Sequence, residues 1–481
     1  MPRIPIPLQG SHQIGRANAA SALECINMYQ ETSKVSKNKV SLYPTPGLLA
    51  LVSAGIGPCR GNGEEFDGNA YFVSGSKLIK IDSSFTASEV GTLTTSTGSV
   101  SMASSSTQLL IVDGADGYIW DGTTFTTISD IDFPRATVCA YMDTYFIVND
   151  EDSPGVFNIS ATDDGLVWGA LDFGISESSP GALKNIKVIH NTLFLFSSIA
   201  TEPFYNSGNA DFPFEPLRNS KIESGLQASF SVVQADNTLY WLGANKEGVN
   251  QFIRLNGYNP EVVSTREIEY ELSTYSRTSD CTAYSYQQAG HVFVVFSFPA
   301  QDRTLVYDIS ENTWHRRKAF DMGRHRGEGH LSFNGKHIIG DHITSQFYEL
   351  SLGTYTDTSA LSYIERQVIT GHVHDQGSNI TVHCLEVDFA GGEGVLTGQG
   401  SDPTITLYYS KDEGNTWSTG LQKALGAMGQ YRKRARFFGL GMGENFVFKL
   451  VVTDPIKLAI VGMYLTYHVL DFYKEKAGEE A

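Results

Sequence analysis

The chain has 481 residues, of which 41% are hydrophobic, 11% aromatic and only 18% charged. Such a chain is too apolar to be disordered and too long for one ordinary core, so we expect about three domain-sized units unless a barrel or propeller absorbs the length. The formal net charge of −18 argues against a protein that binds nucleic acid over its whole surface by counterion release.

The N-terminal region, residues 1–47, is Pro-, Asn- and Ser-containing extended sequence with one short possible helix around Ala19 to Cys25. We expect it to form an arm that packs on the C-terminal domain. Its first residues, MPRIPIPLQG, lack the charged start and apolar run of a signal peptide, and no stretch approaches the roughly 18 apolar residues that span a bilayer. We therefore expect synthesis in a cytosol and no membrane insertion.

Seven hairpin-like units of alternating apolar and polar residues follow, within residues 48–370. Each has an apolar strand, a polar turn and a second strand, and successive units start 35 to 54 residues apart. They begin at Asn69, Gln108, Asp143, Asn191, Asn237, His291 and Lys336. A repeat of this length is typical of β-propeller blades, whose small sheets stack around an axis because none can bury both faces alone.

The rival reading of the repeat region is two consecutive β-sandwiches. Sandwiches explain the alternation equally well, but they give no reason for a nearly regular period. The 47 glycines suit many short strands joined by tight turns. The sequence therefore predicts an all-β fold with a propeller of six to seven blades.

The pattern of apolar and polar residues changes after the last repeat. GHVHDQGSNI reads as a linker over 371–379, and strands resume at TVHCLEVDF, TITLYYS, FVFKLVV and IKLAIVGMYLTYHVL. These strands can form a β-sandwich-like domain over 380–470, within the usual size range of a domain. An acidic tail, 471–481, ends the chain.

One motif in this domain suggests an enzyme. Residues 410–417, SKDEGNTW, fit the Asp-box pattern of sialidase propellers at Ser410, Asp412, Gly414, Thr416 and Trp417. The chemistry of the motif is that of a turn, since Asp412 can accept backbone N–H groups and Gly414 can take positive φ. A glycan-cleaving or glycan-binding protein is therefore the alternative hypothesis.

Two observations weigh against that alternative. The Asp box lies outside the repeat, and the arginines, tyrosine and carboxylates of a sialidase site fall into no spaced motif. The chain also lacks P-loop, dinucleotide-binding, zinc-protease and serine-hydrolase motifs. Near His325 and His330, GRHRGEGH is read as a solvated loop, because adjacent arginines repel a metal cation. We expect no catalysis, no cofactor and no metal.

A basic run in the last domain, YRKRARF, places Arg432, Arg434 and Arg436 at alternate positions. On a strand these three side chains share one face, and a row of guanidinium groups needs acids to meet it. In so acidic a chain, intersubunit or interdomain carboxylates are favoured over phosphates.

The segment around this run resembles the closing part of the packaged-DNA stabilisation, or tail nozzle, proteins of short-tailed bacteriophages. The resemblance is carried by a glycine and tyrosine before alternating arginines, a Gly-containing turn, a strand, T-D-P and a final G-x-Y-L strand. These are Gly429, Tyr431, Arg432, Arg434, Gly439, Phe446 to Val452, Thr453, Asp454, Pro455, Lys457, Gly462, Tyr464 and Leu465.

The N-terminal end is similar to the same family. It has INMYQET at Ile26 to Thr32, YPTPGL at Tyr43 to Leu48, and the pair Arg60-Gly61. The chain departs from the family pattern at Phe437 to Gly441, where FFGLG replaces an aromatic residue followed by two arginines.

The resemblance implies a structural protein of the virion tail, made in the host cytoplasm. Such a protein forms a ring, expected to be a hexamer, below the portal and the adaptor (head-to-tail connector) ring. It retains packaged double-stranded DNA and later lets the DNA pass during ejection. Further expected partners are a tail needle and tail fibre or tailspike proteins. The candidate interface residues are Arg432, Arg434, Arg436 and Asp454.

Overall fold

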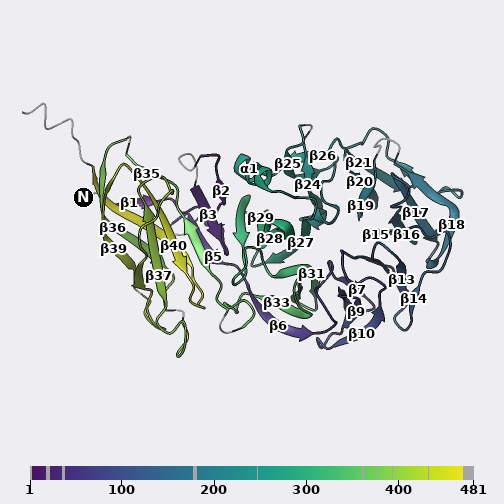
Figure 1. Cartoon of the computed structure of the whole chain (residues 1–481), viewed down its shortest axis with the longest axis horizontal. Coiled ribbons are helices and arrows are strands. Elements are labelled where there is room, and N and C mark those ends of the chain that lie inside the picture. The colour runs from purple at the N-terminus through teal and green to yellow at the C-terminus, as the bar shows by residue number, and fades with distance from the viewer. Residues whose placement is uncertain are drawn as a thin grey trace, which may run out of the picture.

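A computed structural model of the chain describes residues 3–17, 22–34, 38–176, 181–245, 247–359, 362–375, 377–392, 394–431 and 433–469. The expected acidic tail, 471–481, lies outside this part. The molecule is elongated, with a ring of small sheets at one end and a β-sandwich at the other (Figure 1). Within the described residues, no helix has the length and apolar character needed to cross a membrane.

The ring is a β-propeller of seven blades in the described residues, each an antiparallel sheet of four strands. Blade 1 comprises β7 (Glu64–Phe66), β8 (Asn69–Ser74), β9 (Lys77–Ile81) and β10 (Ala87–Thr92). Blade 2 comprises β11 (Ser101–Ser104), β12 (Leu109–Val112), β13 (Gly117–Trp120) and β14 (Phe125–Thr127). Blade 3 comprises β15 (Cys139–Met142), β16 (Tyr145–Asn149), β17 (Val156–Ala161) and β18 (Asp164–Ile175).

The other four blades complete the circle. Blade 4 comprises β19 (Leu183–Ile189), β20 (Thr192–Ser197), β21 (Thr201–Asn206) and β22 (Phe214–Pro216). Blade 5 comprises β23 (Val233–Ala235), β24 (Thr238–Ala244), β25 (Asn250–Asn256) and β26 (Asn259–Val262). Blade 6 comprises β27 (Thr282–Gln288), β28 (His291–Phe298), β29 (Arg303–Asp308) and β30 (Thr313–Arg317). Blade 7 comprises β31 (Gly327–Phe333), β32 (Lys336–Asp341), β33 (Gln346–Ser351) and, from the N-terminal region, β6 (Gly47–Ser53). Short helices η1 (Ser229–Ser231), α1 (Arg266–Thr274) and η2 (Pro299–Gln301) lie between strands.

The repeated hairpins of the sequence are the second and third strands of the blades. The turn before the second strand holds two successive residues with positive φ in six of the seven blades, as at Asp236 and Asn237 (φ 45° and 60°). That conformation is the type I′ turn, whose twist matches the flanking strands. Apolar side chains of neighbouring blades pack against each other, so the core runs around the ring rather than through one sheet.

The sandwich is built from both ends of the chain. Its outer sheet has the order β39-β36-β41-β5-β4, with β1 on β41. The second sheet has the order β3-β34-β40-β37-β38, with β2 on β3 and β35 on β40. The N-terminal strands are β1 (Arg3–Ile6), β2 (Gln13–Ile14), β3 (Ala22–Ile26), β4 (Met28–Thr32) and β5 (Val40–Pro44). The C-terminal strands are β34 (Arg366–Ile369), β35 (Val373–His374), β36 (Ile380–Phe389), β37 (Thr404–Ser410), β38 (Leu421–Ala424), β39 (Ala435–Gly443), β40 (Asn445–Val452) and β41 (Ile460–Val469).

Strand β3 joins the two ends of the molecule. It pairs with β34 of the sandwich on one side and meets β30 of blade 6 on the other, through Ile26 and Arg316. The Arg316 guanidinium lies 2.6 Å from Oε1 of Glu24, and Gln367 donates to the other oxygen of that carboxylate at 2.6 Å. One continuous sheet therefore runs from blade 6 into the sandwich.

Two local expectations from the sequence are wrong. Residues 22–25 of the expected short helix lie in β3, because pairing on both sides of the strand overrides a weak local helical tendency, and residues 19–21 lie outside the described part. The expected linker 371–379 contains β35, which pairs with β40 through Val373 and Phe446. The segment is polar because it lies at the edge of the sandwich, not because it separates two domains.

Candidate functional site: the outer face of the sandwich

The predicted arginine row lies at the edge of the outer sheet, next to Glu386. Arg434 Nη1 donates to Glu386 Oε1 at 2.8 Å, and Arg436 Nε donates to Oε2 at 2.7 Å. Arg434 also lies 2.7 Å from Asp388, again on β36. Arg432 lies outside the described residues, and β39 begins only at Ala435. The carboxylates that meet Arg434 and Arg436 are thus supplied by the same sheet.

A third arginine completes this cluster from the other end of the chain. Arg3 of β1 donates to Glu386 Oε1, and its guanidinium carbon lies 4.0 Å from the ring centroid of Tyr464. Burial alone would raise the pKa of Glu386. The hydrogen bond from Arg436 and the charges of all three arginines outweigh burial and hold that pKa below its usual value.

The cluster carries an excess of positive charge. Three guanidinium groups face two carboxylates, and the side chains of Arg3 and Arg436 are about half exposed. Beside them Phe438 is 66% exposed, on an edge strand that pairs on only one side among the described residues. Exposed arginine and aromatic side chains are the residues enriched in protein interfaces.

The fourth candidate interface residue, Asp454, is engaged within its own domain. Its Oδ2 accepts a hydrogen bond from the backbone N–H of Thr404 at 2.7 Å, and its carbonyl accepts one from Arg366 at 3.0 Å. Arg366 is buried, and burial lowers its pKa to about 10. The T-D-P segment therefore fixes the turn between β40 and β41, and an interface role for Asp454 remains a prediction.

The Asp box is a closed turn between β37 and β38. Asp412 Oδ1 accepts from Ser410 Oγ at 2.6 Å and from the Thr416 backbone N–H at 2.9 Å, while Oδ2 accepts from Thr416 Oγ1 at 2.6 Å. These hydrogen bonds lower the pKa of Asp412 to about 2. Gly414 has φ of +90°. The ring of Trp417 lies under Lys449 Nζ, at 4.4 Å, so the motif has internal partners throughout.

The histidine-rich run of blade 7 is buried, so the expected solvated loop is wrong. His325 and His330 lie inside the propeller, and burial is the main cause that lowers the pKa of each to about 3. The neutral rings pack among aromatic side chains, with His330 stacked on Tyr284 at 5.7 Å. Among the described residues, no group of three or more His, Cys, Asp or Glu could hold a metal ion.

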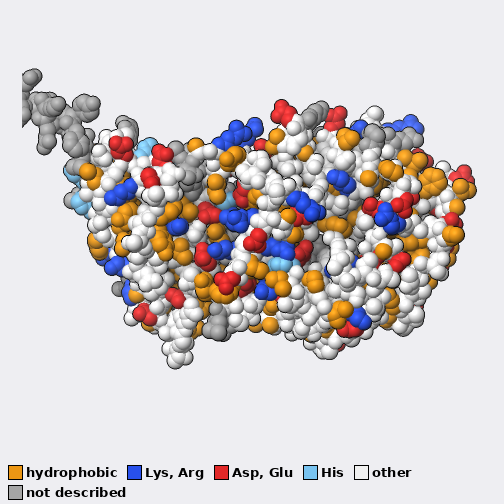
Figure 2. Space-filling view, viewed as in Figure 1, with side chains coloured by type: hydrophobic (Ala, Val, Ile, Leu, Met, Phe, Trp, Pro, Cys, Tyr) orange, Lys and Arg blue, Asp and Glu red, His pale blue; other side chains and the backbone are white. Residues whose placement is uncertain are grey.

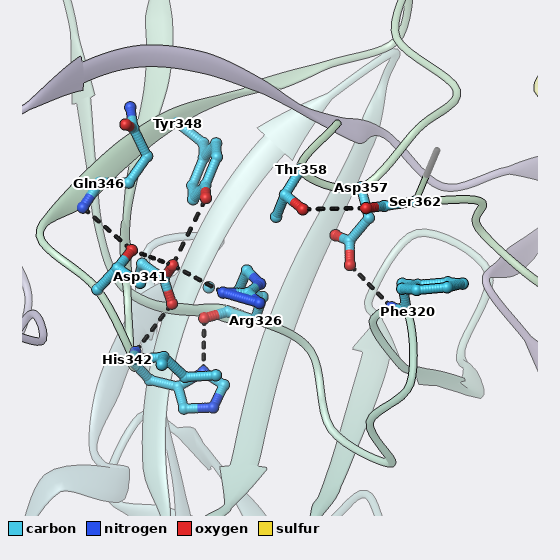
Figure 3. Close-up of polar contacts among 12 residues, drawn as sticks. Phe320, Arg326, Asp341, His342, Gln346, Tyr348, Asp357, Thr358 and Ser362 are labelled. Carbon is cyan, nitrogen blue, oxygen red and sulfur yellow. Dashed lines mark hydrogen bonds and ion pairs between the residues drawn. The ribbon is translucent and has the colours of Figure 1, made fainter. Parts of the chain in front are cut away.

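Next to these histidines, Figure 3 shows one set of polar contacts where β32 leads into β33 in blade 7 and a second set in the segment that follows the blade. Buried Asp341 accepts from Arg326 Nη1 at 3.0 Å and from Thr344 Oγ1 at 2.6 Å. In the following segment, Asp357 accepts from the Phe320 backbone N–H at 2.8 Å. Each charge has a specific partner inside the fold, so we assign these contacts to stability.

The propeller axis contains a cavity of about 100 Å³. Glu64, Lys187 and Glu328 line it together with other residues of blades 1, 2, 4, 6 and 7 and of the segment before blade 5. Burial raises the pKa of both carboxyls and lowers that of the lysine. A sphere of this volume is about 6 Å across and holds a few waters, whereas even the major groove of a DNA duplex is about 12 Å wide. The cavity is therefore too small to admit a DNA duplex.

Comparison with known proteins identifies the family. Residues 3–355 match the family described as bacteriophage P22 Gp10, beta-propeller, and residues 365–468 match the one described as bacteriophage P22 Gp10, beta-sandwich. The chain belongs to this family. It is a structural protein of the phage virion tail, of the kind that stabilises packaged DNA, and both the resemblance and the all-β fold predicted from sequence are confirmed.

Other comparisons add little. No curated protein matches the chain. The computationally designed protein Ika8 is 13% identical, with a TM-score of 0.37, and covers 69% of this chain and 100% of its own. The N-terminal domain of Nup159 is 10% identical, with a TM-score of 0.40, and covers 69% of this chain and 99% of its own. Similarity this low carries no argument about function.

Sequence reasoning missed Glu386 and Arg3, the two residues that complete the cluster. The local signal for Glu386 was present, because the predicted strand TVHCLEVDF has Glu386 and Asp388 at alternate positions, which places both carboxylates on one face. Arg3 gave no such signal, since its position beside Glu386 depends on pairing between the first and last strands of the chain.

Proposed function

We propose that the chain forms a ring in the phage tail, below the portal and the adaptor ring, that retains packaged DNA and forms part of the channel for its ejection. The observation that carries this proposal is that two models of one tail-protein family together span residues 3 to 468. A hexamer is the proposed stoichiometry. Assembly follows synthesis in the host cytoplasm.

The small cavity at the propeller axis supports a ring as the route for DNA. A duplex cannot pass through one chain, so the channel must lie between several copies of the chain. With a net charge of −18 per chain, acidic walls would repel the phosphates of the duplex and keep it from adhering during passage. Double-stranded DNA is then a transient partner.

The arginine cluster is proposed as an assembly surface. Its excess positive charge and the exposed Phe438 are complementary to a partner surface that carries carboxylates and apolar side chains. Other proposed partners are the adaptor ring on one side and, on the other, a tail needle and tail fibre or tailspike proteins. We propose no catalytic role, because in the described residues the Asp box and the three clustered arginines are engaged by the fold itself.

Electron microscopy tests the proposal directly. The purified chain, mixed with its adaptor ring, should add a further ring of density coaxial with the adaptor. Particles assembled without the chain should package DNA and then lose it, which nuclease digestion of released DNA would measure. A chain that binds no adaptor, together with stable DNA retention in its absence, would contradict the proposed function.

A further inference from the structure

The outermost strand of blade 3 is unusually long and exposes an apolar ridge. Strand β18 has 12 residues, whereas the outermost strands of the other blades have three to seven. Along it Leu171 is 84% exposed, and Val167, Phe173 and Ile175 are also exposed. The loop between β14 and β15, which joins blade 2 to blade 3, adds Ile131, which is 95% exposed. We call Ile131, Val167, Leu171, Phe173 and Ile175 the blade 3 ridge.

The loop that carries Ile131 is held against β18. Asp130 Oδ2 accepts a hydrogen bond from the Trp168 backbone N–H at 3.0 Å, and the Phe133 ring lies 5.0 Å from that of Trp168. Register shifts between β17 and β18 place Leu171 in a bulge between Trp168 and Phe173. The loop of Ile131 is anchored at Trp168, so these apolar side chains lie along the outer edge of blade 3. Contiguous exposed apolar side chains with a polar rim mark protein interaction sites in soluble proteins.

The surroundings of the ridge are strongly acidic. Between residues 130 and 183 the sequence has ten Asp or Glu and one basic residue, Arg135, whose guanidinium lies 2.8 Å from Asp152. Asp163, Asp164 and Asp172 flank the ridge on or next to β18. Such a surface repels a copy of itself and also repels phosphates, so its partner must combine apolar side chains with basic ones.

The chain itself carries a surface of that kind at its other end. Arg3, Arg434, Arg436, Phe438 and Met442 form what we call the arginine face of the sandwich. Phe438 and Met442 are exposed by about half or more. Arg436 uses Nε for Glu386, and no further ion pair is formed by this side chain among the described residues. Its terminal nitrogens can therefore meet another carboxylate.

The two surfaces lie at opposite ends of the long axis. Figure 1 places β39 and β36 at one extreme of the molecule and β18 at the other. Figure 2 shows hydrophobic side chains beside acidic ones at the β18 end. Two complementary patches at opposite ends produce a head-to-tail contact, and repeated head-to-tail contacts close into a ring when the rotation allows.

We propose that the blade 3 ridge of one copy docks on the arginine face of the next copy. The inference rests on the proposed ring and specifies the contact that builds it. Leu171 and Phe173 would pack against Phe438 and Met442, and acids such as Asp172 would pair with Arg434 and Arg436. Apolar burial would supply affinity, while the opposite charges fix which surface meets which.

Two exposed-site variants test this contact. Leu171→Asp blocks the ridge and leaves the arginine face intact, whereas Phe438→Asp does the reverse. The matched control is Ile199→Asp, at another position that is more than half exposed. Circular dichroism and thermal melts first establish that each variant is folded. Mass photometry then measures the assemblies formed by wild type, by each variant alone and by the two variants mixed in equal amounts.

A head-to-tail contact gives a distinctive result in the mixture. Wild type and the control should form rings, and each variant alone should remain at the 52.7 kDa of one chain. The mixture should stop at twice that mass, because only one intact ridge and one intact arginine face can meet. Rings formed by either variant, or a mixture that contains monomers only, would overturn this contact. Wild type that stays monomeric at every concentration, with and without the adaptor ring, would instead refute the ring.

Discussion

Arg436 lies directly across from Glu386 in the register of β36 and β39, and its Nε is 2.7 Å from the Glu386 carboxylate. The acid that meets the arginine row is thus a neighbour in the same sheet. Because Arg3 and Arg434 converge on that carboxylate as well, a single acid holds together strands from both ends of the chain.

Glu386→Gln should therefore destabilise the sandwich. The change removes the charge that faces three arginines and turns one oxygen into a donor that faces donors. Hydrogen bonds to charged groups contribute about 1.5 to 3 kcal/mol, and the partial exposure of the arginines weakens them. We therefore expect the free energy of unfolding to fall by about 2 kcal/mol. Chemical denaturation of wild type and variant measures it. Glu247→Gln, on an exposed propeller loop, is the control, and equal losses in both variants would contradict the role of Glu386.

The arginine row should matter more for assembly than for folding. Arg432→Ala combined with Arg434→Ala should leave the monomer folded by circular dichroism. The loss of stability should be about 1 to 2 kcal/mol, because the Arg434 side chain is partly exposed while its partners Glu386 and Asp388 are largely buried. Incorporation of the chain onto the complex of adaptor and portal should fall markedly, because a truncated interface charge costs about 2 to 5 kcal/mol. Lys423→Ala, an exposed cation on β38, is the control. Normal incorporation of the double variant would show that these arginines serve only the fold of their own domain.

The Asp412 turn should make a pH-dependent contribution to stability. The pKa of Asp412 is lowered from 3.8 to about 2 in the folded chain, so its contribution is complete above pH 4 and is lost as the pH falls toward 2. Asp412→Ala should lower the Tm at neutral pH and leave assembly unchanged. Thermal melts of wild type and variant should converge in acid. A variant whose Tm equals that of wild type at neutral pH would contradict a structural role for this motif.

The propeller was predictable from local signals, because each repeat holds two adjacent strands with a turn at a short sequence separation. Non-local pairing was not. Blade 7 needs β6, which is almost 300 residues away from β33 in sequence and pairs with it from Gly47 to Ser53. Strands β1 and β3 were missed for the same reason, because β1 pairs with β41 and β3 pairs with β34, and both partners follow the propeller in the sequence.

The histidines show a second limit of sequence reasoning. His325 and His330 lie between charged neighbours in sequence, which favoured a solvated loop. Pairing of β31 with β32 turns His330 inward beside His337, and Arg324 pairs with Glu328 in the fold. The Glu386 cluster was half predictable, since the alternating arginines identified one side of it and the register of β36 with β39 supplied the other.

No glycan cleavage is expected from the isolated chain. The three clustered arginines that could hold a sialic acid carboxylate already hold Glu386, and Asp412 is bound within its turn. A fluorogenic sialoside incubated with the chain should release no product above a buffer blank, with a known sialidase as the positive control. Turnover that disappears in Arg436→Ala would contradict this expectation and favour the glycan hypothesis.

The buried histidines should make the propeller sensitive to acid. In the folded chain the pKa values of His325 and His330 are lowered to about 3, with burial as the largest cause, against 6.5 for an exposed histidine. Between these values the unfolded chain binds protons that the folded chain does not, so stability falls as the pH drops below 6.5. At about pH 5 each histidine should cost roughly 2 kcal/mol relative to neutral pH.

His330→Leu isolates one of these two contributions. The variant keeps a buried apolar side chain and removes a titrating group, so its unfolding free energy should decline less steeply between about pH 6.5 and 5 than that of wild type. The comparison uses the slope against pH, because the substitution also changes packing on Tyr284 at every pH. His190→Leu, at an exposed turn, should leave the slope close to that of wild type. Parallel pH profiles for wild type and His330→Leu would show that His330 titrates normally in the folded chain.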